Sequence, residues 1–351
     1  MQNTENRADT PLRLSILDQS PIAEGSTGAD ALRNTLELAR LAEARGYHRF
    51  WVAEHHGTPG LASASPEVLI GPIAAATSRL RVGSGGVMLP HYSPLKVAES
   101  FSILAGLFPD RIDLGLGRAS GTDPTTTFAL QRDRRQSAPD DFPEQLSELL
   151  AYLGDRMPPG HPFARLASLP GRPGAPEPWL LGSSPQSGTW AAELGLPYMF
   201  ADFISPTGAT IARRYQEEFT PSEALKAPKT GVAVWAICAD TDEEAIRLAS
   251  SARMMFTLMF RGRLIPVPPV EKALAFLAEE KRERGALDPM PRARRNILGS
   301  PETVKREIEA VAKEYGAEEV MVVSIMYDHA ARMRSYELIA EAFGLDQLSG
   351  S

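Results

Sequence analysis

Cysteine is nearly absent from this chain, because Cys238 is the only one among its 351 residues. A single thiol excludes both a disulfide framework and a cysteine-based metal cluster within one chain. Cys238 lies at the end of the apolar run GVAVWAIC, so we expect it to be a buried, structural thiol.

Positive charge and long apolar runs are also scarce. The chain has 37 Lys and Arg against 44 Asp and Glu, a formal net charge of −7 at pH 7. A chain without a basic surplus lacks the field that would hold a phosphate polymer, so nucleic acid is not an expected partner. No stretch approaches the roughly 18 apolar residues of a membrane span, and the first eleven residues lack the apolar core of a secretory signal. We therefore expect a cytoplasmic enzyme.

The chain lacks a glycine-rich dinucleotide fingerprint. In a doubly wound sheet the first strand would lead into a GxGxxG turn, whereas the apolar run at 12–17 leads into DQSPIAEGSTG. A chain of 351 residues with 43% hydrophobic content exceeds the usual single domain unless it forms an α/β barrel. The length therefore allows either one large barrel or two ordinary domains.

Short apolar runs alternate with longer segments of helical period, which is typical of repeated βα units around a parallel sheet. The runs expected to be strands are 12–17, 49–53, 80–84, 111–117, 178–182, 197–201, 231–237 and 319–324. Between the strands, Gly46 and Gly316 are predicted helix stops, and Ser300 with Pro301 predicts a helix start. This order predicts an α/β fold, a (β/α)8 TIM barrel forming one domain over 12–345, with flexible ends at 1–11 and 346–351.

Two segments are additional to the strands and helices of a minimal barrel. Residues 157–178 contain seven prolines and three glycines, which predicts an extended surface excursion without regular structure. Residues 253–293 join an apolar RMMFTLMFRGR to a PVPP break and a charged helix. Insertions after barrel strands usually lie at the active-site mouth, so both are candidates for substrate-facing or gating elements. For the Met and Phe cluster, a peripheral patch or a subunit contact is an equal alternative.

In a barrel the working residues follow the strands. Glu54, His55 and His56 come directly after the second predicted strand. The histidine pair beside a carboxylate could be an acid–base site, a metal site or a structurally satisfied pair, although no third metal ligand is evident. After the third strand, Gly83, Gly85 and Gly86 would let a flat ligand lie on the main chain, or would serve a tight turn.

Arg118 follows the fourth predicted strand, where it could neutralise a phosphate or form a salt bridge at the rim. After the fifth strand, serines and glycines precede a helix that begins near Pro185. Hydroxyls and free N–H groups at a helix start favour an anion, although an ordinary serine N-cap is the alternative. Together these features suggest a flat ring that carries one phosphate, which is the shape of FMN.

The blocks LSILDQSPI, WVAEHH, AAATSRLRVGSGGVMLP, FPDRIDLGLGRASGTDP, LLGSS and LGSPETV, in this order, resemble the luciferase-like flavin monooxygenases. The likeness extends over residues 12 to about 345 and is closest to the branch assigned to natural-product biosynthesis. It implies FMN as cofactor, delivered in reduced form by a separate flavin reductase, which acts with oxygen on a small organic substrate. It also implies a homodimer.

The resemblance also implies roles for single residues. His55 matches a histidine near the reacting flavin carbon, with Glu54 and His56 as its neighbours, and Arg118 matches an arginine that contacts the flavin. The segment beside the flavin ring, commonly with a non-prolyl cis peptide, comprises Ser84, Gly85, Gly86 and Met88. The phosphate-binding loop comprises Gly182, Ser183, Ser184, Gln186, Ser187 and Gly188.

One block departs from the family pattern. Relatives usually read Pro-Asn-His before the small residue and proline, whereas this chain has His91 and Tyr92 in PHYSP. The difference points to a loop that tunes the substrate pocket.

Two alternative functions remain compatible with the sequence. A dehydrogenase on the same barrel would use a deazaflavin, and a non-catalytic flavin-binding partner subunit would have no use for His55 and Arg118. A barrel that acts on sugars or aldol substrates would need paired carboxylates or a Schiff-base lysine at strand ends. Lys96 is expected within a helix, so it does not meet that need.

Overall fold

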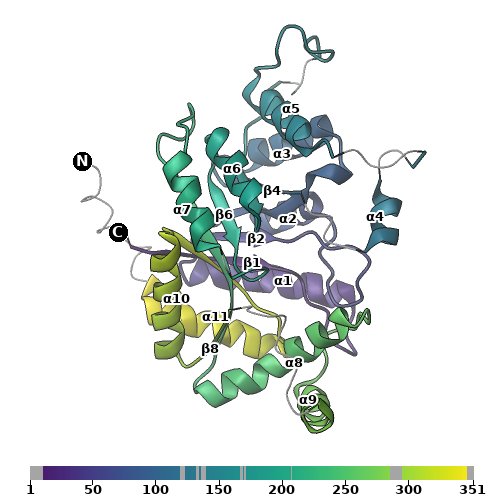
Figure 1. Ribbon diagram of the computed structural model, residues 1–351, viewed down its shortest axis with the longest axis vertical. Coiled ribbons are helices and arrows are strands. Elements are labelled where there is room, and N and C mark those ends of the chain that lie inside the picture. The colour runs from purple at the N-terminus through teal and green to yellow at the C-terminus, as the bar shows by residue number, and fades with distance from the viewer. Residues whose placement is uncertain are drawn as a thin grey trace.

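The computed structural model describes residues 11–118, 123–131, 134–135, 140–166, 169, 171–206, 208–284 and 295–345. The ends predicted to be flexible lie outside these residues, apart from Pro11. Within the described residues, strands and helices alternate from β1 to α11 (Figure 1).

All eight predicted strands are present, and the third extends beyond its expected end as far as Met88. A ninth strand, β8, was missed, because its four residues offer only Ile297 and Leu298 as an apolar signal. The strands of the described residues are β1 (Arg13–Asp18), β2 (Arg49–Val52), β3 (Arg81–Met88), β4 (Ile112–Gly117), β5 (Glu177–Gly182), β6 (Tyr198–Ala201), β7 (Thr230–Cys238), β8 (Asn296–Gly299) and β9 (Glu319–Val323).

The sheet closes on itself. Strands β1 to β6 pair in sequence order, β6 pairs with β7, and β9 lies between β7 and β1. Every pairing is parallel, as in Ile16 opposite Phe50 and Tyr198 opposite Thr230. Strand β8 pairs with β7 outside this closed ring of eight. The predicted (β/α)8 TIM barrel is therefore confirmed.

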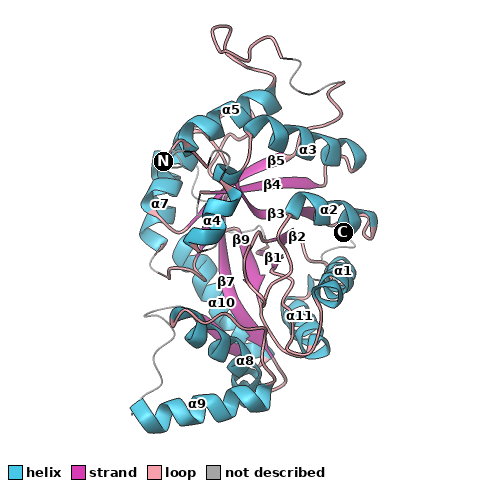
Figure 2. Cartoon of the chain, turned by 90° about the vertical axis from the view of Figure 1, so that its right-hand side faces the viewer, coloured by secondary structure: helices cyan, strands magenta, loops and turns pink. Residues whose placement is uncertain are grey.

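Helices surround the barrel (Figures 1 and 2). The described helices are α1 (Gly28–Ala44), α2 (Pro66–Ala75), α3 (Pro94–Leu107), α4 (Pro124–Leu130), α5 (Phe142–Gly154), α6 (Pro185–Glu193), α7 (Ala209–Glu218), α8 (Asp242–Phe260), α9 (Val270–Arg284), α10 (Pro301–Tyr315) and α11 (His329–Phe343), with a short 3-10 helix η1 (Leu89–His91).

The predicted helix signals act as expected. The Ser300 hydroxyl accepts a hydrogen bond from the Thr303 amide at the start of α10, and Gly316 ends that helix in a left-handed conformation. Gly46, with φ of +80°, follows the end of α1. Lys96 lies within α3, as predicted.

An ion-pair network fills the interior of the barrel near the starts of its strands. Arg49 is fully buried and contacts Asp113 at 2.8 Å and Glu319 at 2.7 Å. Its guanidinium lies 4.6 Å from the ring centre of Trp179. Burial alone would raise the pKa of Glu319, but the Arg49 charge holds this pKa below its usual value. The interior is thus closed by paired charges, so it is no open channel.

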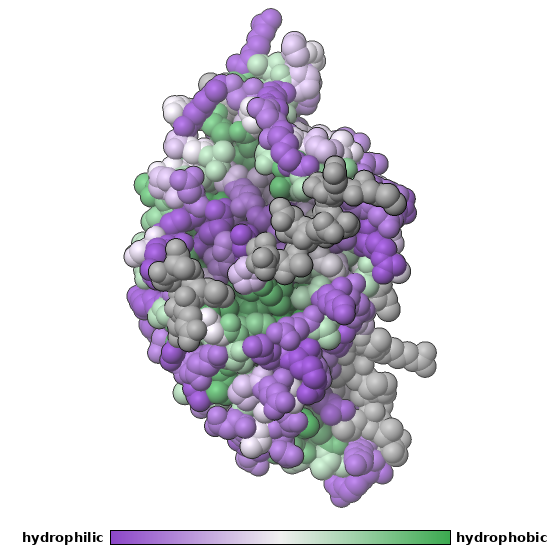
Figure 3. All heavy atoms as spheres, turned by 90° about the vertical axis from the view of Figure 1, so that its left-hand side faces the viewer, coloured by the Kyte–Doolittle hydropathy of each residue, from purple (hydrophilic) through white to green (hydrophobic). Residues whose placement is uncertain are grey.

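The main hydrophobic core lies between the sheet and the helices. Outward-facing strand residues such as Ile16, Phe50 and Val234 pack there against the helices, and Cys238 is buried with them, as predicted. Figure 3 shows a face on which hydrophilic side chains predominate, with hydrophobic ones mainly across its middle. Among the helices of the described residues, none has the length and hydropathy needed to cross a membrane.

The two additional segments differ in structure. Of the excursion predicted at 157–178, the described residues before 177 contain neither helix nor strand, whereas Glu177 and Pro178 already belong to β5. Ser102 on α3 donates a hydrogen bond to the carbonyl of Gly174. The second segment forms the end of α8 and the whole of α9. Gly60, in the loop after β2, packs against the chain between these helices, because a Cβ there would lie 2.7 Å from the Ile265 carbonyl oxygen.

Candidate active site

The residues singled out in the sequence meet at one end of the barrel. Because all strands are parallel, their carboxyl ends share one rim. Glu54 to His56 follow β2, and the glycine segment, which comprises Ser84, Gly85 and Gly86, lies in β3. Arg118 follows β4, and the serine loop at 182–188 begins at the end of β5. Helix α4 lies on this side of the molecule in Figure 2, and Asp123 at its start lines the cavity described below.

Glu54 is completely buried and organises the loop beyond β3. Its carboxylate accepts hydrogen bonds from the Met88 amide at 3.0 Å, from the Tyr92 hydroxyl at 2.9 Å and from His56 Nε2 at 2.9 Å. Three donors compensate the loss of hydration of this carboxylate. Burial, followed by the Glu54 charge, raises the pKa of Tyr92 well above its usual value, so the hydroxyl remains a donor.

His55 points to a different partner from His56. Its Nε2 lies 3.4 Å from Nε2 of Gln19, so the amide can donate a hydrogen bond to an unprotonated ring nitrogen. Its backbone amide donates to the carbonyl of Ser63 at 2.9 Å. The two adjacent histidines thus have different partners: His56 binds the buried carboxylate of Glu54, whereas His55 contacts Gln19, and both line the cavity described below.

No metal centre is built from these groups. Within the part of the chain that the structure describes, no set of three His, Cys, Asp or Glu side chains is placed to hold a metal ion. The ring of His56 instead stands edge-on to His91, with centroids 6.1 Å apart.

The glycines of β3 are required by close packing. A Cβ on Gly85 would lie 2.5 Å from Leu17 Cδ1, and one on Gly86 would lie 2.7 Å from the Gly115 carbonyl oxygen. The peptide bond between Gly85 and Gly86 is cis. The Ser84 hydroxyl donates to the Gly115 carbonyl at 2.9 Å, while the pairing of β3 with β4 shifts register between Ser84 and Val87. This stretch presents main chain without side chains between two strands.

Arg118 lies beside the helix that follows the serine loop. The Arg118 guanidinium is 5.7 Å from the ring centre of Trp190 on α6, the helix that the serine loop opens. Its side chain is about half exposed, and its ion pair with Asp140 is long, at 4.0 Å. A cation therefore lies against the helix whose start could receive a phosphate.

The members of the serine loop are not equivalent. Ser184 caps α6 by accepting from the Ser187 amide, while the buried Ser187 hydroxyl donates to the Ser184 carbonyl at 2.8 Å. A Cβ on Gly182 would lie 2.3 Å from Ser187 Oγ, and one on Gly188 would lie 2.9 Å from the Ile211 side chain. Ser184 and Gln186 are exposed and Ser183 is half-buried. The exposed members can meet a ligand, whereas Ser187 and both glycines shape the turn.

A cavity of about 530 Å³ opens beside His55. Its size is typical of a small-molecule site. Apolar side chains form most of its wall, and polar groups gather at Gln19, His55, His56, Thr58 and Asp123. The apolar lining comprises Leu61, Phe203, Ile204, Trp235, Met255, Phe256, Met259, Leu264, Ile265 and Ile325.

The sequence analysis did not predict several of these cavity-lining residues as site residues. Gln19 immediately follows β1, so the strand-end rule that selected Glu54 would also have selected it. Met255, Phe256 and Met259 belong to the Met and Phe cluster, for which the sequence allows a substrate-facing element and a peripheral patch or subunit contact equally. Their side chains line the cavity, whereas the described residues of 157–176 do not.

The described residues fit a flat anionic cofactor. The glycine segment of β3 offers main chain without side chains, and Arg118 supplies a cation beside Trp190 on α6. These groups occupy neighbouring strand ends β3, β4 and β5, which pair in that order.

Comparison with known proteins shows the family of this chain. Residues 12–319 match the family model described as luciferase-like monooxygenase. The uncharacterised protein YwcH of Bacillus subtilis is 47% identical over 94% of this chain and 98% of its own. N-acetyl-S-alkylcysteine monooxygenase of the same bacterium is 38% identical, again over 94% and 98%.

Solved structures show the same architecture. Apo-MsnO8 superposes with a TM-score of 0.84 at 42% identity, covering 96% of this chain and 98% of the other. The oxygenating constituent of 3,6-diketocamphane monooxygenase from Pseudomonas putida, in complex with FMN, gives a TM-score of 0.68 at 21% identity over 95% and 98%. The latter likeness concerns the fold alone. This chain is an oxidoreductase that belongs to the luciferase-like monooxygenase family.

Proposed function

We propose that this protein is an FMN-dependent monooxygenase that uses reduced FMN and O2 to oxidise a small, largely apolar organic substrate. The observation that carries the proposal is that His55, the glycine segment and Arg118 lie at the ends of neighbouring strands on one barrel rim, where His55 also lines an apolar cavity. The FMN bound by the diketocamphane oxygenating constituent supports the choice of cofactor.

Each cofactor-binding group has a physical task. Arg118 and the hydroxyls of Ser183 and Ser184 bind the phosphate, since a guanidinium and hydroxyl donors at a helix start both favour an anion. The main chain of Gly85 and Gly86, which carries no side chain, would lie against the ring system at the β3 strand end. When bound, reduced FMN supplies the activation of oxygen.

The protein's own residues manage protons and water. His55 accepts or returns a proton at its imidazole ring, and the Gln19 amide beside Nε2 orients the unprotonated ring. Glu54 is a positioning residue, because its fully buried carboxylate holds His56, Tyr92 and the Met88 amide instead of meeting a ligand. The apolar wall formed by Phe203, Trp235 and the α8 methionines excludes water from the reacting centre.

Two partners follow from the proposal. A separate reductase supplies reduced FMN, as the naming of one neighbour as an oxygenating constituent suggests by analogy. A homodimer would cover Val68 on α2 and Ile103 and Leu107 on α3, which are 68%, 55% and 67% exposed on adjacent helices. Sedimentation of the purified protein, with Leu107→Glu as variant, tests the dimer.

The test of function is an anaerobic titration of the purified protein with reduced FMN, oxidised FMN and a reduced deazaflavin, followed by calorimetry. Tighter binding of reduced FMN, with substrate-dependent oxygen incorporation from 18O2 after mixing with oxygen, supports the monooxygenase. Tighter binding of the deazaflavin would make the protein a dehydrogenase. Binding without oxygen incorporation into any substrate screened would favour the non-catalytic flavin-binding subunit.

A further inference from the structure

A second cavity, of about 570 Å³, lies between helices α8 and α9 and strands β7 and β8. It is separate from the first cavity but adjoins it, because Trp235, Phe256 and Ile325 line both. Trp235 and Phe256 meet edge to face with ring centroids 5.3 Å apart. The proposed reaction makes no use of this space.

The wall of the second cavity is apolar but its charged groups are all cationic. Twelve of the sixteen lining residues are apolar, and the charged ones are Arg253 on α8 and Lys281 on α9. Among the residues that the structure describes, no aspartate or glutamate lines the cavity. Two cations facing an apolar space, in a chain of net charge −7, favour a ligand that is negatively charged at one end.

Hydrogen-bond donors at this cavity lack partners among the described residues. Ser250 Oγ and Trp235 Nε1 are buried, in side chains 3% and 6% exposed, and neither has a hydrogen-bond partner there. Arg253 is half-buried and forms no ion pair with any residue that the structure describes. Buried donors without acceptors are costly, so an acceptor ligand would be stabilised by them.

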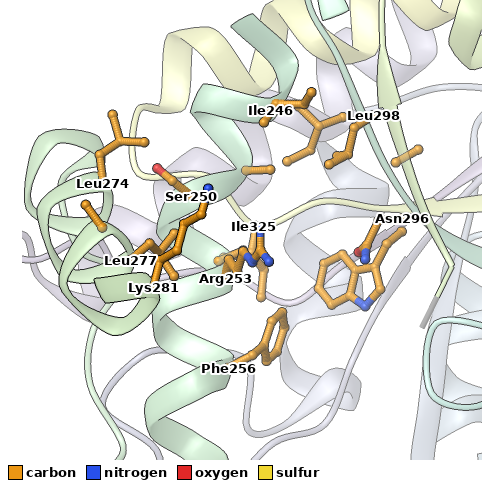
Figure 4. A pocket seen from close by; sticks show the side chains of 16 residues that line it. Ile246, Ser250, Arg253, Phe256, Leu274, Leu277, Lys281, Asn296, Leu298 and Ile325 are labelled. Atoms are coloured by element: carbon orange, nitrogen blue, oxygen red, sulfur yellow. The ribbon is translucent and has the colours of Figure 1, made fainter. Parts of the chain in front are cut away.

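The close-up in Figure 4 shows how these groups lie. Ser250 and Lys281 face one another between α8 and α9, and Arg253 lies in the middle of the view beside Ile325, with Phe256 below it. Leu274, Leu277, Ile246 and Leu298 surround them with apolar surface.

We propose that this second cavity binds an organic carboxylate with an apolar body. The carboxylate pairs with Arg253, and the hydrocarbon lies among the leucines of α9 and the Trp235–Phe256 wall. A guanidinium binds a carboxylate through two parallel hydrogen bonds, and the volume is in the range of small-molecule sites. The site is distinct from the flavin and substrate groups, since Arg253, Ser250 and Lys281 do not line the first cavity.

Calorimetry on the purified full-length protein without added flavin tests this site, with decanoate as the probe and 1-decanol as the uncharged comparison. We expect decanoate to bind, and Arg253→Met to weaken it at least about tenfold while leaving 1-decanol within about twofold. The matched control is Arg247→Met, which removes a cation from the same helix; Arg247 pairs with Glu244 and Glu271 and does not line the cavity. Arg247→Met should leave decanoate binding unchanged.

A second readout separates the two cavities. Bound 10-bromodecanoate should quench tryptophan fluorescence in the wild type and in Met259→Ala, which alters only the first cavity, but much less in Arg253→Met. The proposal is overturned if decanoate does not bind, if the Arg253 and Arg247 variants weaken binding equally, or if only the Met259 variant abolishes quenching. Because no flavin is present, these outcomes do not depend on the cofactor assignment.

Discussion

Tyr92 donates a hydrogen bond to the fully buried carboxylate of Glu54, with 2.9 Å between Tyr92 Oη and Glu54 Oε1. Glu54 follows β2, whereas Tyr92 follows η1 beyond β3. The bond therefore ties the loop after one barrel strand to the end of its neighbour, next to the glycine segment. Tyr92 is also where the sequence departs from the usual family pattern.

Tyr92→Phe should lower the free energy of unfolding by about 1.5–3 kcal/mol, because it removes a donor from a buried charged acceptor. Urea denaturation measures the change. Tyr47→Phe is the matched control, since the buried Tyr47 hydroxyl donates to the neutral carbonyl of Tyr336 at 2.7 Å and should be worth about 0.5–1.5 kcal/mol. Equal losses of unfolding free energy in the two variants would show that the Glu54 charge does not strengthen the Tyr92 hydrogen bond.

Gly86→Ala should destabilise the barrel by about 1–3 kcal/mol, because the new Cβ would lie 2.7 Å from the Gly115 carbonyl oxygen and force a backbone shift. Gly160→Ala is the control, since its Cβ would meet nothing within 4 Å. Thermal unfolding followed by circular dichroism compares the two. A Gly86 variant as stable as the control would mean that the β3–β4 contact is looser than described.

Stability should fall as the pH is lowered from 6.5 toward 4, in part through His48. Burial lowers the pKa of His48 from 6.5 to about 4, and Arg49 Nη2 lies 3.1 Å from its Nε2, a contact that suits the neutral ring. In that window the unfolded chain binds a proton that the folded protein does not, so protonation favours unfolding. His48→Gln should flatten the dependence of the urea midpoint on pH between 6.5 and 4. If the urea midpoint of the variant depends on pH as steeply as that of the wild type, titratable groups other than His48 cause the loss of stability.

His55→Ala should reduce turnover by about 10²- to 10⁴-fold while reduced FMN binds within about threefold of wild type. The reason is that His55 lies beside Gln19 in the wall of the apolar cavity, whereas Arg118 lies beside Trp190 on α6. His161→Ala, in the segment before β5, is the control and should keep full activity. Undiminished turnover in the His55 variant would remove this residue from the mechanism.

Arg118→Met should weaken reduced FMN about 10- to 100-fold and leave reduced riboflavin nearly unaffected, since riboflavin lacks the phosphate. Anaerobic titration with both flavins gives the ratio. The Met side chain can still pack against Trp190, which separates loss of charge from loss of packing. If the variant binds both flavins more weakly by the same factor, Arg118 contacts the ring system and not the phosphate.

Much of the fold was predictable because a barrel strand is marked by an apolar run within its own residues. The apolar runs gave seven strands to within one residue at each end, and the helix ends at Gly46, Ser300 and Gly316 follow from cap chemistry. The short strand β8 was not predictable, since its assignment depends on pairing with β7 rather than on its own residues.

The site could be predicted only in part. Strand-end position selected His55, Arg118 and the serine loop, and the parallel barrel brings all of them to one rim. The sequence could not assign different partners to His55 and His56, because that depends on where Gln19 and Glu54 lie in space. Nor could it distinguish the inward hydroxyl of Ser187 from the exposed Ser184.

The sequence by itself determined the alternation of strands and helices, the closed barrel and the family, because periodicity, caps and motif blocks are local properties of the chain. Only the tertiary structure decided that Glu54 is a buried anchor, that the methionines of α8 line the first cavity, and that Arg253 faces a second one. Burial, cavity shape and the partner of each polar atom arise from segments far apart in the chain, so no local pattern contains them.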